Sequence, residues 1–264
     1  MANTSPLGFT LTENDEPVVR RITTHDLREA LSRGYADFMA TPTQIAFLGI
    51  IYPLVGWIAA RAAAGGELLP LFYPLIAGLS LMGPLAAVGI YELSRRREQG
   101  KPVSWLNAFA VLLSPSLRSI VTLGLLLCVI FVAWLFAASL TFRLTMGDRT
   151  FGSVGEFAQA VLTTADGWNL ILLGNAVGFL FAALVLALTV VSFPLLLDHD
   201  VGVRVAVCTS LKAVMLNPVP MAIWGLIVAS LLLVGSLPLF VGLAVVMPLL
   251  GHATWHLYRR VVQV

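Results

Sequence analysis

Charged residues are scarce in this sequence. Of its 264 residues, 11% are charged and 58% are hydrophobic, whereas an ordinary soluble domain has about 25% charged residues. A soluble fold of this length needs a polar surface, and 16 basic and 14 acidic residues crowded into a few short stretches cannot supply one. The composition therefore predicts a protein solvated by lipid. The net charge of +2 is too small to indicate a nucleic-acid partner.

The sequence has only two cysteines, and its first residues do not resemble a signal peptide. Cys128 lies in an apolar run and Cys208 in a polar segment read as a loop, so we expect two free thiols and no disulfide framework. Residues 1–20 are polar, contain acidic residues and have no apolar core of a signal peptide. We expect a flexible polar tail over 1–20, a single membrane domain over 21–264, and insertion directed by the first span.

Catalytic and transport signatures are missing as well. The sequence has no phosphate loop, nucleophile elbow, zinc-protease signature or cysteine-pair motif. No Asp, Glu, Lys, Arg or His lies in the middle of a predicted span, although ion-coupled carriers usually need one at membrane depth. These absences predict a protein that is not an enzyme and has no cofactor or metal. Asn, Ser and Thr residues in the spans could bond helices together, which we favour, or line a cavity.

Long apolar runs are what the sequence has in abundance. They predict an all-α, polytopic membrane helix bundle with six transmembrane helices. The fifth run is short and is followed by a turn at 235–238, so the last two should form a helical hairpin. Five spans with a re-entrant fifth segment is the alternative. The six predicted spans are 43–62, 68–93, 117–142, 168–197, 219–234 and 237–258.

The distribution of Lys and Arg predicts the orientation. Thirteen of the 16 basic residues precede span one, follow span six, lie between or border spans two and three, or lie between spans four and five. Basic loops tend to remain in the cytoplasm. With an even number of spans, we therefore expect both termini in the cytoplasm.

Several polar segments have one apolar face, which is typical of helices lying at the membrane interface. In 26–40, Leu27, Leu31, Tyr35 and Phe38 fall on one side and Asp37 largely on the other, with Thr23 or Thr24 as cap. Residues 105–113, 203–216 and 154–164 have similar patterns. Polar-Pro steps at 41–42, 114–115 and 217–218 each lead into an odd-numbered span. This predicts a possible three-fold pseudo-repeat of helix pairs with interfacial helices.

Three groups of side chains are candidates for a site. His252 and His256 are four residues apart and could share a ligand such as a metal or haem iron. We favour polar groups at the membrane boundary, because ligation would need a third ligand and His199 is the only candidate on that side. Glu92 with Arg95, Arg96 and Arg97 could fix a helix exit or contact anionic lipids or a partner. Arg259 and Arg260 are read in the same way.

The chain resembles a family of predicted bacterial integral membrane proteins known as domain of unknown function 2189. The resemblance implies a bacterial inner-membrane protein but brings no established activity, cofactor or catalytic residue. Some relatives look to have been labelled cytochrome c oxidase subunit I, yet this sequence has four histidines where that subunit needs six ligands. The resemblance rests on the segments 21–31 (RITTHDLREAL), 37–38 (DF), 47–56 (FLGIIYPLVG), 83–86 (GPLA), 91–98 (YELSRRRE) and 251–260 (GHATWHLYRR).

Three functions remain open from the sequence. The first is a non-enzymatic accessory, assembly or scaffold protein, possibly beside a respiratory complex, whose partners are the lipid bilayer and a membrane protein complex. The second is a small transporter or channel for a neutral or lipid-like substrate, suggested by the possible repeat. The third is a haem or metal handling protein that uses His252 and His256.

Overall fold

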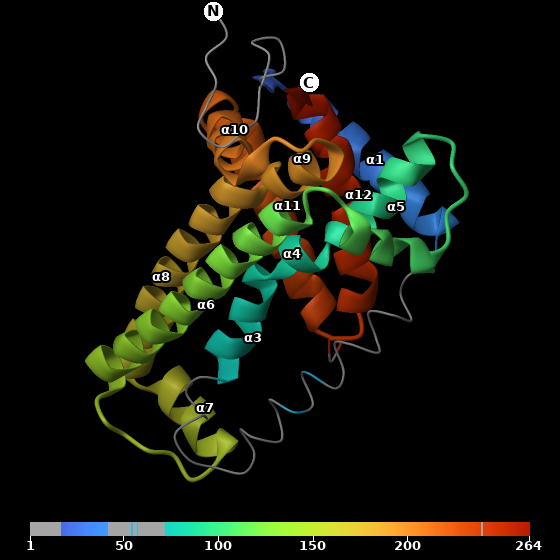
Figure 1. The fold of residues 1–264 in the computed structure, drawn as a ribbon. Helices are drawn as coiled ribbons and strands as arrows, with labels where there is room; N and C mark the ends of the chain where they lie inside the picture. The colour runs from blue at the N-terminus through green and yellow to red at the C-terminus, as the bar shows by residue number, and fades with distance from the viewer. Residues whose placement is uncertain (1–16, 42–53, 55–56, 58–71, 239) are drawn as a thin grey trace, which may run out of the picture.

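The structure is a computed structural model that describes residues 17–41, 54, 57, 72–238 and 240–264. The described part is all-α apart from two short strands (Figure 1). Most of the predicted first span, 43–62, lies outside the described residues.

Three helical segments of the described part are long and apolar enough to cross a membrane. They are α6 (Leu117–Met146), the segment Ala165–Asp198 made of α8 (Ala165–Thr189) and α9 (Ser192–Asp198), and α11 (Pro218–Ser236). These segments correspond to the third, fourth and fifth predicted spans.

The predicted second span, 68–93, is not one continuous helix where the structure describes it. It is divided into α3 (Phe72–Leu81), α4 (Gly83–Ala86) and α5 (Val88–Glu98). The first break, at Met82, lies just before Pro84, whose ring collides with the carbonyl four residues earlier and whose nitrogen has no hydrogen to donate. Pro194 explains the break between α8 and α9 in the same way.

The predicted sixth span begins later than expected. Helix α12 (Leu243–Val261) starts after a turn in which Phe240 has a φ of 65°, a left-handed conformation that is unusual for a bulky residue. Gly235 and Gly242 lie against one another in this turn, and a Cβ on Gly242 would be 2.7 Å from the Gly235 carbonyl oxygen. The predicted hairpin of the last two helices is present.

The first amphipathic helix, α1 (Thr24–Ala40), packs on α12. Its start is fixed by Thr23, whose backbone N–H and hydroxyl donate to the Asp26 carboxylate at 2.8 and 2.9 Å. A Cβ on Gly34 would lie 2.5 Å from the backbone of Ala253, so the absence of a side chain lets the helices approach this closely.

The buried face of α1 differs from the predicted one. Leu27 and Phe38 are buried as expected, but Tyr35 is 56% exposed and Asp37 is buried. The contact surface is centred on the small residues Ala30 and Gly34, which the apolar pattern of large side chains did not include.

The other amphipathic segments also form helices. Residues 105–113 are a 3₁₀-helix, η2 (Trp105–Leu113), and 203–216 lie in α10 (Gly202–Leu216), where Cys208 is exposed on a helix rather than in a loop. Helix α7 (Val154–Thr163) lies at the opposite end of the molecule from α10 (Figure 1). Cys128 and Cys208 are free thiols, as predicted.

The two strands hold the first and last described segments together. Strand β1 (Val18–Val19) pairs antiparallel with β2 (Val262–Gln263). Val18 and Val19 lie in the segment assigned to the polar tail, and here they are ordered. The side chain of Asn217, just before α11, extends this link by accepting from the Ile22 N–H at 2.8 Å and donating to the Arg20 carbonyl at 2.9 Å.

Most polar side chains within the candidate spans bond to their own helix. Thr141, Asn175 and Thr189 each donate to the carbonyl four residues earlier, at 2.8, 2.7 and 2.6 Å. Ser192 is different, because its hydroxyl also contacts the Ala206 carbonyl of α10 at 3.0 Å. Of these four, only Ser192 therefore joins two helices in the way the sequence predicted.

Candidate functional site

The candidate residues of the sequence converge at one end of the molecule. Here α1, α5, α9 and the C-terminal half of α12 meet, and we call this region the polar layer (Figure 1). It is centred on the carboxylates of Asp37, Glu92 and Asp198.

Asp37 of α1 is the acceptor at the centre of the first cluster. Its Oδ2 atom lies 2.7 Å from the Ser94 hydroxyl and 2.8 Å from His256 Nε2, and its Oδ1 atom lies 3.0 Å from Arg97 Nε. Ser94 Oγ is also 2.7 Å from His252 Nδ1. Helices α1, α5 and α12 are thus joined through one buried carboxylate.

The number of hydrogens fixes the direction of these bonds. The single hydroxyl hydrogen of Ser94 goes to Asp37, so Nδ1 of His252 must carry the hydrogen that it shares with Ser94 Oγ. Nε2 of His252 then carries a lone pair. This nitrogen is buried and has no hydrogen-bond partner among the described residues.

The environment of Asp37 favours its charged form. Burial of the carboxyl raises its pKa, but hydrogen bonds from His256 and Ser94 and the nearby imidazoles outweigh burial and hold the pKa below its ordinary value of 3.8. The carboxylate therefore remains negative at neutral pH and accepts hydrogen bonds from all three side chains around it.

A second cluster ties the end of α12 to α5 and α9. Asp198 accepts from the Tyr258 hydroxyl at 3.0 Å and from Arg259 Nη1 at 3.3 Å. Arg259 Nε also donates to Glu98 at 3.1 Å, and Glu98 accepts from Trp255 Nε1 at 3.0 Å. Burial lowers the pKa of Arg259, but the Glu98 and Asp198 carboxylates outweigh it and raise the pKa overall.

The remaining predicted residues form ion pairs close by. Glu92 is 3% exposed and binds both Arg95 and Arg96, at 2.8 Å in each ion pair. Arg95 also donates to the Leu197 carbonyl at 2.9 Å. Arg260 pairs with Glu29 of α1. These basic residues are thus engaged in bonds within the protein.

His252 and His256 share a face of α12, as predicted from their spacing. Both imidazoles are directed to the carboxylate of Asp37. His256 bonds Asp37 directly and His252 reaches it through Ser94. His199, the predicted third ligand, lies 3.3 Å from Asp198 in the second cluster. Within the described ranges, no three His, Cys, Asp or Glu side chains are gathered as a metal site.

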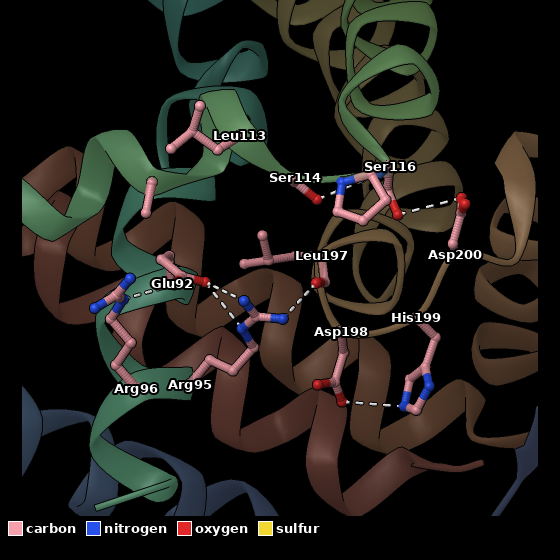
Figure 2. Close-up of a pocket in the computed structure, with 12 residues that line it drawn as sticks. Glu92, Arg95, Arg96, Leu113, Ser114, Ser116, Leu197, Asp198, His199 and Asp200 are labelled. Carbon is pink, nitrogen blue, oxygen red and sulfur yellow. Dashed lines mark hydrogen bonds and ion pairs between the residues drawn. The ribbon is translucent and has the colours of Figure 1, made fainter. Parts of the chain in front are cut away.

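A cavity of about 290 Å³ opens beside Glu92, between the end of α5, η2 and the segment joining α9 to α10 (Figure 2). Arg95 and Arg96 lie on one side of it, and Ser116 and Asp200 on the other, with Ser116 Oγ donating to Asp200 at 3.3 Å. Acidic, basic and hydroxyl groups therefore line a single space.

A second, smaller cavity of about 140 Å³ lies among α3, α6, α7 and α8. Its lining is mostly apolar and includes Trp134, Phe142 and Phe157. The indole of Trp134 donates to the Pro74 carbonyl at 2.8 Å, so its polar atom is already bonded.

Sequence reasoning missed Asp37, Ser94 and Asp198 as members of these clusters. Asp37 was assigned to the polar face of the first amphipathic helix, and Ser94 and Asp198 were not among the candidates. A usable signal was present for Asp37, because it follows Ala30 and Gly34 at helical spacing on the face of small residues. No pattern in the sequence indicated that Ser94 and Asp198 contact residues of other helices.

Comparison with known proteins gives one match. The model of a family described as "Predicted integral membrane protein (DUF2189)" matches residues 72–198, just under half of the chain. Segments 83–86 and 91–98 lie inside this match, whereas the other segments quoted for the resemblance lie outside it. No curated protein and no solved structure matches the chain. Residues 72–198 are therefore similar to this family of predicted integral membrane proteins, which confirms the resemblance inferred from the sequence over that part of the chain.

Proposed function

We propose that the protein acts through contacts in the membrane, as an accessory, assembly or scaffold protein, and not as an enzyme. One observation carries this proposal: the side chains best suited to catalysis are buried and bonded to one another. Asp37, Ser94 and His252 are 6%, 0% and 1% exposed.

The hydrogen bonds of Ser94 favour a structural role. A serine nucleophile needs a base that accepts its proton and a path by which a substrate reaches its oxygen. Here the Ser94 proton goes to a carboxylate that also binds His256 and Arg97, and His252 donates to the serine oxygen. This arrangement joins three helices and leaves the hydroxyl covered.

We further propose six spans with both termini on the cytoplasmic side of a bacterial inner membrane. Pairing of β1 with β2 supports this, because chain ends on one side of a membrane require an even number of crossings. Arg95, Arg96, Arg97 and Arg259 lie in the same polar layer, in agreement with the preference of basic residues for the cytoplasm. The step Ser114-Pro115 lies one residue before α6, and Asn217-Pro218 is the start of α11, which supports two of the three units of the possible pseudo-repeat.

The test is purification of the full-length protein from its native membrane in mild detergent, followed by mass spectrometry of the proteins that accompany it. We expect a stoichiometric membrane partner, with respiratory subunits the first candidates on the resemblance alone. The Ser94→Ala variant, if it remains folded, should retain that partner and complement a deletion strain. Loss of complementation by a folded Ser94→Ala variant would contradict a purely structural serine.

A protein that purifies without a partner would favour the second function, handling of a neutral or lipid-like molecule. The apolar cavity beside Trp134 supports this alternative, although about 140 Å³ is well below the ~300 Å³ lower limit of ordinary small-molecule sites. An absorption and metal scan of the same sample tests the third function. Stoichiometric haem or metal that is lost in His252→Ala would establish ligation by that imidazole.

A further inference from the structure

The cavity beside Glu92 contains unused donors on one side. Arg96 donates from Nε to Glu92 at 2.8 Å, and its terminal nitrogens have no bond to another described residue. The buried Glu92 carboxylate holds this guanidinium at the cavity wall, together with that of Arg95 (Figure 2). A planar guanidinium with free N–H groups is suited to bind a phosphate.

The other side of the cavity carries an unused acceptor. One oxygen of Asp200 accepts from the Ser116 hydroxyl, and the second has no partner in the part of the chain that the structure describes. Figure 2 shows Asp200 on the side of the cavity away from Arg96. A carboxylate in this position is suited to accept hydrogen bonds from an ammonium group.

The charges around the cavity favour a ligand that carries both signs. Arg95 and Arg96 are basic, whereas Glu92, Asp198 and Asp200 are acidic. Glu92 is already paired with Arg95 and Arg96, and Asp198 with Arg259. An anion without a positive group would still be repelled by the Asp200 carboxylate, because like charges at close range repel. A zwitterion avoids this repulsion, because each of its ends meets the opposite charge.

An edge of exposed apolar side chains borders the cavity on the side of η2. Leu113 lines the cavity and is 88% exposed, and Leu112 and Phe109, also on η2, are 62% and 60% exposed. Two residues separate Ser114 from the start of α6 at Leu117, one of the candidate spans. Exposed apolar side chains beside the start of a span are typical of a helix that lies in the membrane interface.

We propose that this cavity binds the headgroup of a zwitterionic phospholipid that has a phosphodiester and a primary ammonium group. The phosphate lies at Arg96, the ammonium at Asp200, and the acyl chains leave past Leu113. The volume of about 290 Å³ is close to the lower end of the ~300–1,000 Å³ found for small-molecule sites. This site needs no protein partner, so it stands apart from the accessory function proposed above.

The test uses the purified full-length protein in vesicles of equal parts phosphatidylethanolamine, phosphatidylcholine and phosphatidylglycerol. After extraction into mild detergent, native mass spectrometry counts the lipids that remain bound. We expect phosphatidylethanolamine to be retained about tenfold over phosphatidylcholine, the factor expected from one charge-assisted hydrogen bond. Asp200→Asn should bring that ratio close to one, and Arg96→Gln should lower retention of all three lipids.

A matched control is Arg33→Gln, which changes an exposed arginine paired with Glu29 on α1 and should leave retention unchanged. The melting temperature of each variant establishes that it is folded. Equal retention of phosphatidylethanolamine and phosphatidylcholine, a preference for phosphatidylglycerol, or no retention by the wild type would each overturn the proposal. Displacement of the bound lipid by soluble phosphoethanolamine at equal concentration would show that the apolar edge contributes nothing, and would overturn assignment of the site to a lipid.

Discussion

The polar layer and the long helices α6 and α8 bond their polar side chains in different ways. In the polar layer the bonds of Asp37 and Asp198 join residues distant in the sequence, such as Asp37 with His256 and Asp198 with Tyr258. In α6 and α8, Thr122, Thr141 and Asn175 bond to the carbonyl four residues earlier in the same helix. The first region depends on contacts between its own helices. The second satisfies its polar groups locally and exposes apolar side chains, as a helix surrounded by lipid must.

The comparison predicts where single substitutions will matter. Removing a group from the polar layer leaves its buried partners without a bond, whereas removing a hydroxyl that bonds within its own helix leaves the helix backbone intact. The predictions below test this contrast from the largest expected effect to the smallest, in protein purified in one detergent throughout.

Replacing Asp37 should have the largest effect. Asp37→Ala leaves Arg97, His256 and Ser94 without their shared acceptor, and breaking a buried pair costs about 3–5 kcal/mol of unfolding free energy. Thermal and denaturant unfolding followed by circular dichroism measure this change. The control is Asp148→Ala, an exposed carboxylate after α6 that should change stability little. Similar losses in the two variants would contradict the special role of the polar layer.

The second largest loss of stability is expected from a substitution at the close contact of α1 with α12. Gly34→Ala places a methyl group 2.5 Å from the Ala253 backbone, so the helices must separate. Such overpacking costs about 1–3 kcal/mol. The matched control is Gly174→Ala in α8, where an added Cβ meets no atom within 4 Å. A Gly34→Ala variant with the same unfolding free energy as the wild type would contradict this close contact between α1 and α12.

Acid should weaken the same contact through Asp37. Because the pKa of this carboxyl is lower in the folded protein than its ordinary value of 3.8, its charge contributes stability above that value, and this contribution is lost as the pH falls through the folded pKa. Melting temperatures measured from pH 7 down to about 3 should therefore converge for the wild type and Asp37→Asn. Since His252, His256 and Arg97 face the same carboxylate, the difference between the two proteins reports Asp37 together with its coupling to these groups. A constant difference would contradict it.

An ion pair at the opposite end should have the smallest effect. Arg149 and Asp166 lie 3.2 Å apart with side chains 53% and 47% exposed. Exposed pairs contribute about 0–1 kcal/mol, so Arg149→Gln should shift the unfolding free energy by less than about 1 kcal/mol. A loss comparable to that of Asp37→Ala would remove the contrast between the two ends.

Local features were well predicted by the sequence. The start of α1 at Thr23, the positions of α6 and α11 and the hairpin leading into α12 follow from capping residues, apolar run length and turn residues. The breaks within the second and fourth predicted spans were less well predicted. The pattern of apolar residues continues through Met82 and through Val190, and only the backbone geometry imposed by Pro84 and Pro194 shows that the helices break there.

By itself, the sequence determined the apolar helices, their approximate bounds and the gathering of basic residues outside them, because these depend on neighbouring residues and on the energy of moving side chains into lipid. The tertiary structure alone decided that Asp37 is buried against Ser94, His256 and Arg97, and that Arg259 joins Asp198 to Glu98. These residues come from helices far apart in the chain. A carboxylate with a buried partner and one facing water have the same local sequence signal, and only the packing of α1, α5, α9 and α12 distinguishes them.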